Sequence, residues 1–303
     1  MKAAAFSSYG PPEVLRSAEL PEPRAGAGEV RIRVKAAGVM PFDCRARKGE
    51  FPPALTGDFP VVPGNEFAGV VDQVGAGAEG FSVGDSVLGF STLGSYAEYQ
   101  VVSADQVVPK PADMPWEVAG AFSVAGQGAH MGLEQMRVQP GDTVLINGAA
   151  GGLGTASVQL ARERGASTVI GTASEGNHDY LRSLGAVPVT YGEGLVDRIR
   201  AVAPDGVHAS LCAHPEQIRA SVAVTTDIDR VITMVYSDEA KRLGLRDWTG
   251  ARTTARLEEL LELYRGGAFR VHVRRTYPLD QAAEAHRDVG SGHGAGKVAI
   301  LVD

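Results

Sequence analysis

The chain has 303 residues, 44% of them hydrophobic and 21% charged, and a formal net charge of −7. This composition is typical of a soluble globular protein of one or two domains, and the negative charge argues against nucleic acid or an anionic membrane as a partner. Cys44 and Cys212 lie far apart and form no CxxC pair, so neither a disulfide framework nor a structural zinc site is expected. We expect a cytoplasmic location, because the sequence shows no signal-peptide pattern and no run of about 18 apolar residues.

The first third of the chain predicts short β-strands. Residues 30–39 (VRIRVKAAGV) alternate apolar and basic side chains, which is the period-2 pattern of a half-buried strand. Further apolar runs at 67–75, 85–90 and 95–102 are separated by turns rich in glycine and proline. Short strands with frequent turn signals favour a small barrel or sandwich.

From Trp116 onward, helical and strand patterns alternate. We expect helices over 117–136, 152–165 and 178–185, and strands over 143–148, 167–173, 206–212 and 229–235. This alternation predicts an α/β fold with a parallel, doubly wound sheet. An amphipathic helix over 252–267 follows, and the chain ends with a strand over 270–277, a helix over 278–289 and a strand over 296–302.

A glycine-rich stretch, INGAAGGLG at 146–154, connects a predicted strand to a predicted helix. Its register is Ala149-x-Gly151-x-x-Gly154, which is a dinucleotide-binding fingerprint with alanine in place of the first glycine. Backbone N–H groups at the start of such a helix face the phosphates of the cofactor. We therefore expect this turn to bind a diphosphate through the five residues Ala150, Gly151, Gly152, Leu153 and Gly154. The alternative is a strand–turn–helix connection without a ligand.

Ser174 stands twenty residues beyond Gly154, at the end of the next predicted strand. An NAD site usually has a carboxylate at this distance, which would repel a 2′-phosphate, whereas a hydroxyl can donate a hydrogen bond to it. The sequence thus favours NADP(H) over NAD(H). Two features weaken this preference: Glu175 is adjacent, and no Lys or Arg follows before Arg182.

Several stretches together carry a family resemblance: GDTVLINGAAGGLGTASVQLARERGA, AAGVMPFDCRARKG, PGNEFAGVVDQVG and GKVAILV. They resemble the zinc-free quinone oxidoreductase and enoyl reductase branch of the medium-chain dehydrogenase/reductase superfamily, over nearly the whole chain. The resemblance implies a GroES-like, β-rich catalytic domain at 1–114 and 251–303, and a Rossmann NADP-binding domain at 115–250. It also implies NADPH-dependent reduction of an activated C=C bond or a quinone, and a homodimer paired through the nucleotide-domain sheets.

The resemblance places Met40, Asp43 and Asn65 at the reaction site. Zinc-dependent relatives would have cysteine and histidine at the positions of Met40 and Asn65, and a thioether and an amide are poor ligands for Zn²⁺, so no metal is expected. Met40 is interpreted as a wall of the pocket. Asp43 is either a carboxylate at the cleft or a structural one, bonded to nearby backbone or to an arginine. Asn65 either contacts substrate or bonds the backbone of its turn.

Three further residues are singled out by the same resemblance, and Tyr236 by its place at the carboxyl end of the predicted strand over 229–235, where ligands bind in doubly wound sheets. Gly128 replaces a threonine near the nicotinamide, and Asn177 replaces a basic residue on the 2′-phosphate. Tyr191 matches a tyrosine near the adenosine phosphate, with a surface tyrosine as the alternative, and Tyr236 is the nominated proton donor. The departures at Met40 and Gly128 leave two other functions open: a redox-neutral isomerase or cyclase, and a non-catalytic NADPH-binding protein. The expected substrate is a small apolar molecule, a conjugated carbonyl compound or a quinone.

Overall fold

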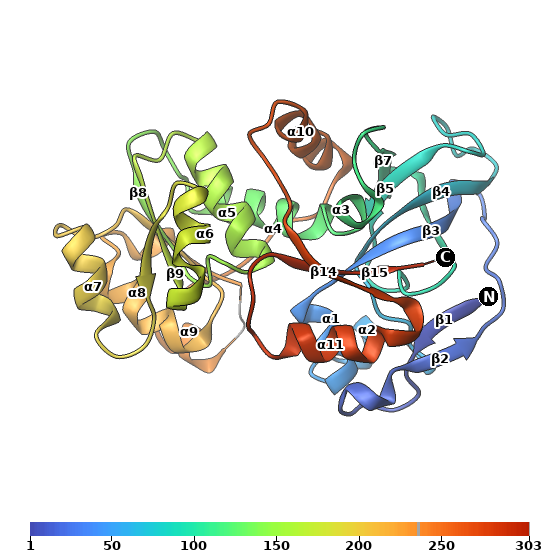
Figure 1. Ribbon diagram of the computed structural model, residues 1–303, viewed down its shortest axis with the longest axis horizontal. Helices are drawn as coiled ribbons and strands as arrows, with labels where there is room; N and C mark the ends of the chain where they lie inside the picture. Colours follow the sequence, from blue (N-terminus) through green and yellow to red (C-terminus); the bar gives the residue numbers. More distant parts are fainter. Residues whose placement is uncertain (235–236, 303) are drawn as a thin grey trace.

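The computed structural model describes residues 1–234 and 237–302. Two sheets lie toward opposite ends of the molecule, and the helices α3 (Trp116–Gly120) and α4 (Ser123–Gln135) run between them (Figure 1). Within the described residues, no helix is long and apolar enough to cross a membrane.

The first sheet combines strands from both ends of the chain. Its order is β14-β15-β3-β4-β5-β7, and β6 pairs with β3. The strands of this sheet are β3 (Glu29–Val39), β4 (Glu66–Val74), β5 (Ser86–Phe90), β6 (Tyr99–Ser103), β7 (Val107–Pro109), β14 (Val273–Pro278) and β15 (Lys297–Leu301). A separate two-stranded ribbon consists of β1 (Lys2–Ala5) and β2 (Arg16–Glu19). Three helices belong to the same part of the molecule: α1 (Pro41–Lys48), α2 (Pro53–Thr56) and α11 (Ala282–Gly290) (Figure 1). The alternation in β3 buries Val30, Ile32 and Val34 completely, as its period-2 pattern predicts.

The second sheet has six parallel strands in the order β10-β9-β8-β11-β12-β13. Numbered along the chain, this is the 3-2-1-4-5-6 order of the doubly wound nucleotide-binding fold, so the expected fold class is confirmed. The strands are β8 (Thr143–Ile146), β9 (Thr168–Ala173), β10 (Val187–Thr190), β11 (Ala209–Cys212), β12 (Val231–Thr233) and β13 (Arg246–Asp247), and the helices are α5 (Gly152–Glu163), α6 (His178–Ser183), α7 (Leu195–Val202), α8 (Ile218–Val224), α9 (Asp238–Arg242) and α10 (Thr254–Arg265). Ligands of such sheets bind beyond the carboxyl ends of the strands, where the strand order reverses, and here that point lies between β8 and β11.

The helix expected over 117–136 is broken at Ala121 and Phe122 into α3 and α4. The physical reason lies in α3, which packs directly on β3. A Cβ atom at Gly120 would stand 2.6 Å from the carbonyl of Ala36, so α3 approaches β3 more closely than any side chain permits. One straight helix would not serve both this close contact and the packing of α4 on α5.

The two parts of the molecule share one hydrophobic core. A single cluster of buried side chains includes Leu88 of β5, Leu133 of α4, Ile146 of β8 and Leu260 of α10, each with no exposed surface. Burial of apolar surface is the main favourable contribution to folding, at about 25 cal/mol per Å². The two sheets are therefore held relative to one another by shared packing rather than by a flexible linker alone.

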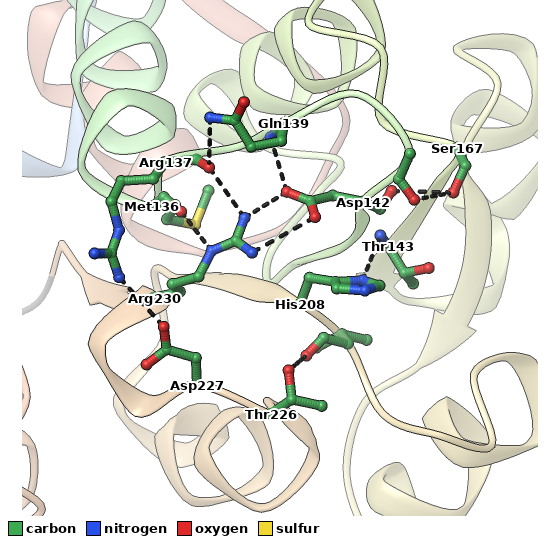
Figure 2. A network of polar contacts seen from close by, with 12 residues as sticks. Met136, Arg137, Gln139, Asp142, Thr143, Ser167, His208, Thr226, Asp227 and Arg230 are labelled. Atoms are coloured by element: carbon green, nitrogen blue, oxygen red, sulfur yellow. Dashed lines mark hydrogen bonds and ion pairs between the residues drawn. The ribbon is translucent and has the colours of Figure 1, made fainter.

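A network of polar side chains lies at the amino ends of the strands of the second sheet, opposite the end that carries the glycine-rich turn. Figure 2 shows the Arg230 guanidinium facing Asp142, just before β8, and the carbonyls of Met136 and Arg137. Gln139 N also donates to Asp142 at 2.8 Å. Burial alone would raise the pKa of Asp142, but the hydrogen bonds from Arg230 and Gln139 hold that pKa below its ordinary value.

We expect Arg230→Met to lower the free energy of unfolding by about 3 kcal/mol, because it leaves the nearly buried Asp142 carboxylate (9% exposed) without its ion-pair partner. Urea denaturation measures the change. Arg137→Met is the matched control in the same network, since its ion pair with Asp227 is 55% and 48% exposed and should contribute less than about 1 kcal/mol. Equal losses in the two variants would contradict the assignment.

Candidate active site

The glycine-rich turn starts where β8 ends and carries the chain into α5. Gly148 has a φ of +65°, which favours glycine, and its N–H donates to Thr172 Oγ1 of β9 at 2.9 Å. A Cβ atom at Gly154 would stand 2.5 Å from Ala149 Cα, so glycine is required for the close packing of turn and helix. These are two of the three roles that glycines play in a dinucleotide-binding turn.

The start of α5 offers unused hydrogen-bond donors. Its N-cap residue is Gly151, which has no side chain to cap the helix. The first intrahelical hydrogen bond runs from Thr155 N to Gly151 O at 2.8 Å, so the N–H groups of Gly152, Leu153 and Gly154 precede it. The side of Gly151 where a Cβ would stand is open among the described residues, of which only Gly148 O lies within 4 Å, at 3.5 Å. Free donors, a positive helix end and an open backbone surface fit a diphosphate.

Gly128 of α4 lies beside the same turn. A Cβ atom on Gly128 would be 3.3 Å from Leu153 Cδ1 and 3.8 Å from Met234 Cε, so the structure brings two predicted cofactor residues together. Met234 follows β12, at the carboxyl edge of the sheet. The nominated proton donor Tyr236 lies outside the described residues.

Ser174, Asn177 and Tyr191 lie close together at the carboxyl ends of β9 and β10, next to β8 in the sheet. Asn177 Nδ2 donates to Ser174 Oγ at 3.2 Å. β9 and β10 are parallel with Ala173 opposite Thr190, which places Tyr191 next to Ser174 at the carboxyl edge. Tyr191 is 44% exposed. These three residues form a polar surface for the adenosine end of a cofactor, and their contact with it stays a prediction.

Asp43 is a completely buried carboxylate that accepts four hydrogen bonds. Oδ1 accepts from Asn65 Nδ2 at 2.7 Å and Gly64 N at 3.2 Å, and Oδ2 accepts from Met40 N at 2.9 Å and Tyr96 Oη at 3.0 Å. Burial raises the pKa of Asp43 to about 6, while these hydrogen bonds oppose the shift. The arrangement favours the structural role for Asp43: it holds the start of α1 and the loop before β4 in one geometry.

Two further predicted catalytic residues, Met40 and Asn65, each donate a hydrogen bond to this carboxylate. Asn65 is 5% exposed, and its amide is oriented by Asp43. Met40 is the N-cap residue of α1 and is partly exposed. Phe42 of α1 stacks on Phe51, with ring centroids 4.6 Å apart.

A buried ion pair joins the catalytic strands to the cofactor turn, and sequence reasoning did not find it. Lys297 Nζ of β15 lies 2.6 Å from Glu66 Oε1, and the side chains are 6% and 0% exposed. Glu66 Oε2 accepts a further bond from Val124 N of α4 at 2.7 Å. The Lys297 side chain passes so close to Gly152 that a Cβ atom there would overlap it. The aliphatic part of Lys297 therefore packs against the first helical residue of the turn, while its ammonium group is paired with Glu66.

Neither cysteine is suited to nucleophilic catalysis. Both are buried, and burial raises the pKa of Cys44 to about 12 and that of Cys212 to about 11, so both are thiols at neutral pH. In the described part of the chain, no group of three or more His, Cys, Asp or Glu side chains is arranged to hold a metal ion.

The mixed sheet built from both chain ends and the doubly wound sheet with its glycine-rich turn define the class of two-domain dehydrogenases and reductases. Residues 26–112 match the alcohol dehydrogenase GroES-like domain family, and residues 184–300 match the zinc-binding dehydrogenase family. The 2-haloacrylate reductase of Burkholderia sp is 30% identical over 334 residues, covering 99% of this chain and 98% of the relative.

Solved structures agree with these matches. The quinone oxidoreductase from Coxiella burnetii superposes with a TM-score of 0.89 at 28% identity, covering 100% of this chain and 99% of that one. The Escherichia coli quinone oxidoreductase complexed with NADPH has a TM-score of 0.90 at 25% identity, covering 99% of this chain and 100% of that one. The chain belongs to the medium-chain dehydrogenase/reductase superfamily and is quinone oxidoreductase-like.

Proposed function

We propose that the protein uses NADPH to reduce an activated C=C bond or a quinone, without a zinc ion. The observation that carries the proposal is the open turn at Gly151, with the donors of Gly152, Leu153 and Gly154 ahead of the first bond of α5. Two relatives support it by their names: the E. coli quinone oxidoreductase was solved with NADPH, and the Burkholderia protein is a reductase of an activated alkene.

The residues of the chain fit this chemistry as binding and orienting groups. The three N–H groups at the start of α5 bind the diphosphate, and the Ser174 hydroxyl donates to the 2′-phosphate. NADPH supplies a hydride when bound. Asn65, held by Asp43, contacts the substrate, and Met40 forms part of the pocket wall. The proton for the reduced product comes from water or from Tyr236.

The donor set does not suit zinc. Asn65 presents an amide whose nitrogen is bonded to Asp43, and Met40 presents a thioether, whereas Zn²⁺ prefers thiolate, imidazole and carboxylate ligands. Without a zinc ion to polarise an oxygen, the conjugated carbonyl group of the substrate makes the β-carbon electron-poor enough to accept a hydride. Metal analysis of the purified protein tests this, and stoichiometric zinc retained through dialysis would contradict it.

A panel of enones, enoyl esters and quinones, followed by NADPH absorbance, tests the activity. We expect oxidation of NADPH with at least one member of the panel. Substrate conversion without a change in absorbance would instead support a redox-neutral isomerase or cyclase. Tight NADPH binding with no turnover across the panel would favour a non-catalytic NADPH-binding protein.

Ser174→Asp should weaken NADPH binding at least tenfold and NADH binding by less than about threefold, because a carboxylate repels the 2′-phosphate that only NADPH carries. Titration of both cofactors by fluorescence or calorimetry measures the two dissociation constants. Ser183→Asp adds the same charge at the exposed end of α6 and is the control. Equal losses for both cofactors at Ser174→Asp would overturn the assignment of this serine.

We also propose a homodimer formed through the edge of the six-stranded sheet. β13 is the edge strand there, and its neighbour β12 pairs with it in parallel. An unpaired edge presents backbone donors and acceptors to a second copy. Light scattering after size exclusion measures the mass, and a monomer at micromolar concentration would contradict the proposal.

A further inference from the structure

Arg252 is a half-buried arginine that reaches from the segment before α10 to the catalytic strands. Its Nη1 donates to the carbonyl of Asn65 at 3.3 Å, and its guanidinium lies 5.4 Å from the centroid of the Phe90 ring. Burial lowers the pKa of Arg252 below its ordinary value. The cation thus lies directly beside Asn65, the residue that we assign to the substrate.

Arg252 has no ion-pair partner among the described residues, since no carboxylate oxygen there lies within 4.0 Å of it. The two carboxylates that influence its pKa, Glu66 and Asp43, are already satisfied. Glu66 is bound by Lys297 and by the N–H of Val124, and both oxygens of Asp43 are occupied. A guanidinium carries five N–H donors, and the one hydrogen bond that Arg252 makes to the described part of the chain goes to a neutral carbonyl. Removing a cation from water without an anionic partner is costly.

The segment around Arg252 is held rigidly in place. Thr253 N donates to the side chain of Gln127 at 2.8 Å, and Gln127 is completely buried in α4. Thr253 Oγ1 in turn accepts from Arg256 N at 3.2 Å and caps α10, a helix of 12 residues. The positive end of that helix therefore adds to the charge of Arg252. Although the protein as a whole carries a net negative charge, it holds a cation in a fixed position next to the proposed reaction site.

We propose that Arg252 binds a carboxylate of the substrate, and that the preferred substrates are activated alkenes bearing a carboxylate group. This inference rests on the proposed function and narrows its substrate class. Arg252 forms charge-assisted hydrogen bonds with the carboxylate, while the neighbouring Asn65 contacts the activated alkene. Binding at two points orients the alkene beside Asn65.

A matched pair of substrates tests the proposal: 4-oxo-4-phenylbut-2-enoate and its methyl ester, which share the enone and differ in charge. Wild-type protein should reduce the acid with a kcat/KM at least tenfold above that of the ester. Arg252→Met should lower kcat/KM for the acid at least thirtyfold, mainly through KM, and change it for the ester by less than threefold. Arg252→Lys should recover part of the loss, because it keeps the charge without the planar fork.

Arg265→Met is the control, since Arg265 is a 49% exposed arginine in an ion pair with Glu262 at the far end of α10 and should leave both substrates unaffected. Equal losses for acid and ester in Arg252→Met would show that Arg252 only braces the Asn65 loop, which would overturn the proposal. Absence of a preference for the acid in the wild type would also overturn it, while the proposed reductase activity would stand.

A binding measurement keeps the two proposals distinguishable if neither compound is reduced. The probe is the saturated acid, 4-oxo-4-phenylbutanoate, with its methyl ester as the control, and thermal shift is recorded in the presence of NADPH. Stabilisation by the acid alone, lost in Arg252→Met and partly kept in Arg252→Lys, supports the carboxylate site even if the reduction fails. No stabilisation of the wild type by the acid contradicts it.

Discussion

Gly151→Ala is expected to raise the dissociation constant for NADPH at least thirtyfold while leaving the fold intact. The backbone of Gly151 has φ −71° and ψ 170°, which any residue adopts. Its Cβ would have room, since of residues 1–234 and 237–302 only Gly148 O lies within 4 Å, at 3.5 Å. The added methyl group costs the protein little, but it stands on the surface that the diphosphate approaches. Cofactor titration and thermal unfolding of the free protein measure the two effects separately.

Gly154→Ala, three residues further along, should behave in the opposite way. Its Cβ would lie 2.5 Å from Ala149 Cα, and backbone atoms of a tight turn have no room to move. We expect a loss of about 3 kcal/mol or more in the free energy of unfolding, measured with urea. Gly176→Ala, where no atom lies within 4 Å, is the control. NADPH binding by Gly151→Ala at wild-type affinity would mean that the turn is only a connection between strand and helix.

The cofactor end of the site could be predicted because its determinants are local. The turn, its strand and its helix occupy one continuous stretch, and Ser174 and Asn177 are three residues apart. Tyr191 joins them because neighbouring parallel strands end at the same edge of the sheet. The strands of the catalytic part were likewise predicted from their alternating pattern, although their order in the sheet depends on packing between the two ends of the chain.

One hydrogen-bond partner of Asp43, the N–H of Met40, is nearby backbone as expected, but Gly64, Asn65 and Tyr96 could not be predicted, because they lie 21 to 53 residues away. An arginine was one expected partner of Asp43, but Arg45 instead pairs with Glu50, at 2.7 Å. No periodicity connects residues so far apart; their approach follows from how α1 packs against the loop before β4.

The roles of the Glu66–Lys297 pair and of Arg252 could not be predicted either, because their partners are even further away in the sequence. Lys297 is separated from Glu66 by 231 residues, and Arg252 from Asn65 by 187. A weak signal was present: Glu66 and Lys297 each begin a strand and are followed directly by a run of apolar residues. A charged residue in that position is buried only when a partner is available, and the sequence does not say which residue that is. The edge strand β13 was also unexpected, because two residues are too short to show a pattern.

Asp43→Ala is expected to lower the free energy of unfolding by about 3 kcal/mol or more at pH 7, because it leaves four buried or partly buried donors without an acceptor. Tyr96→Phe removes only one of those donors and should cost about 1 kcal/mol. Urea denaturation of both variants gives the comparison. Equal small losses would mean that Asp43 does not organise this part of the site.

The pH dependence of the same variant has a defined sign. The pKa of Asp43 is about 6 in the folded protein and 3.8 ordinarily, so between these values the folded state binds more protons than the unfolded state. This carboxyl group therefore makes the wild type more stable as the pH falls from about 6 to about 4, and Asp43→Ala lacks that gain. The stability difference between the two proteins should widen on acidification, by at most about 1.4 kcal/mol per pH unit. If Asp43 were a catalytic proton donor, Asp43→Ala would instead lower kcat with little change in stability. That result would support a catalytic role for Asp43.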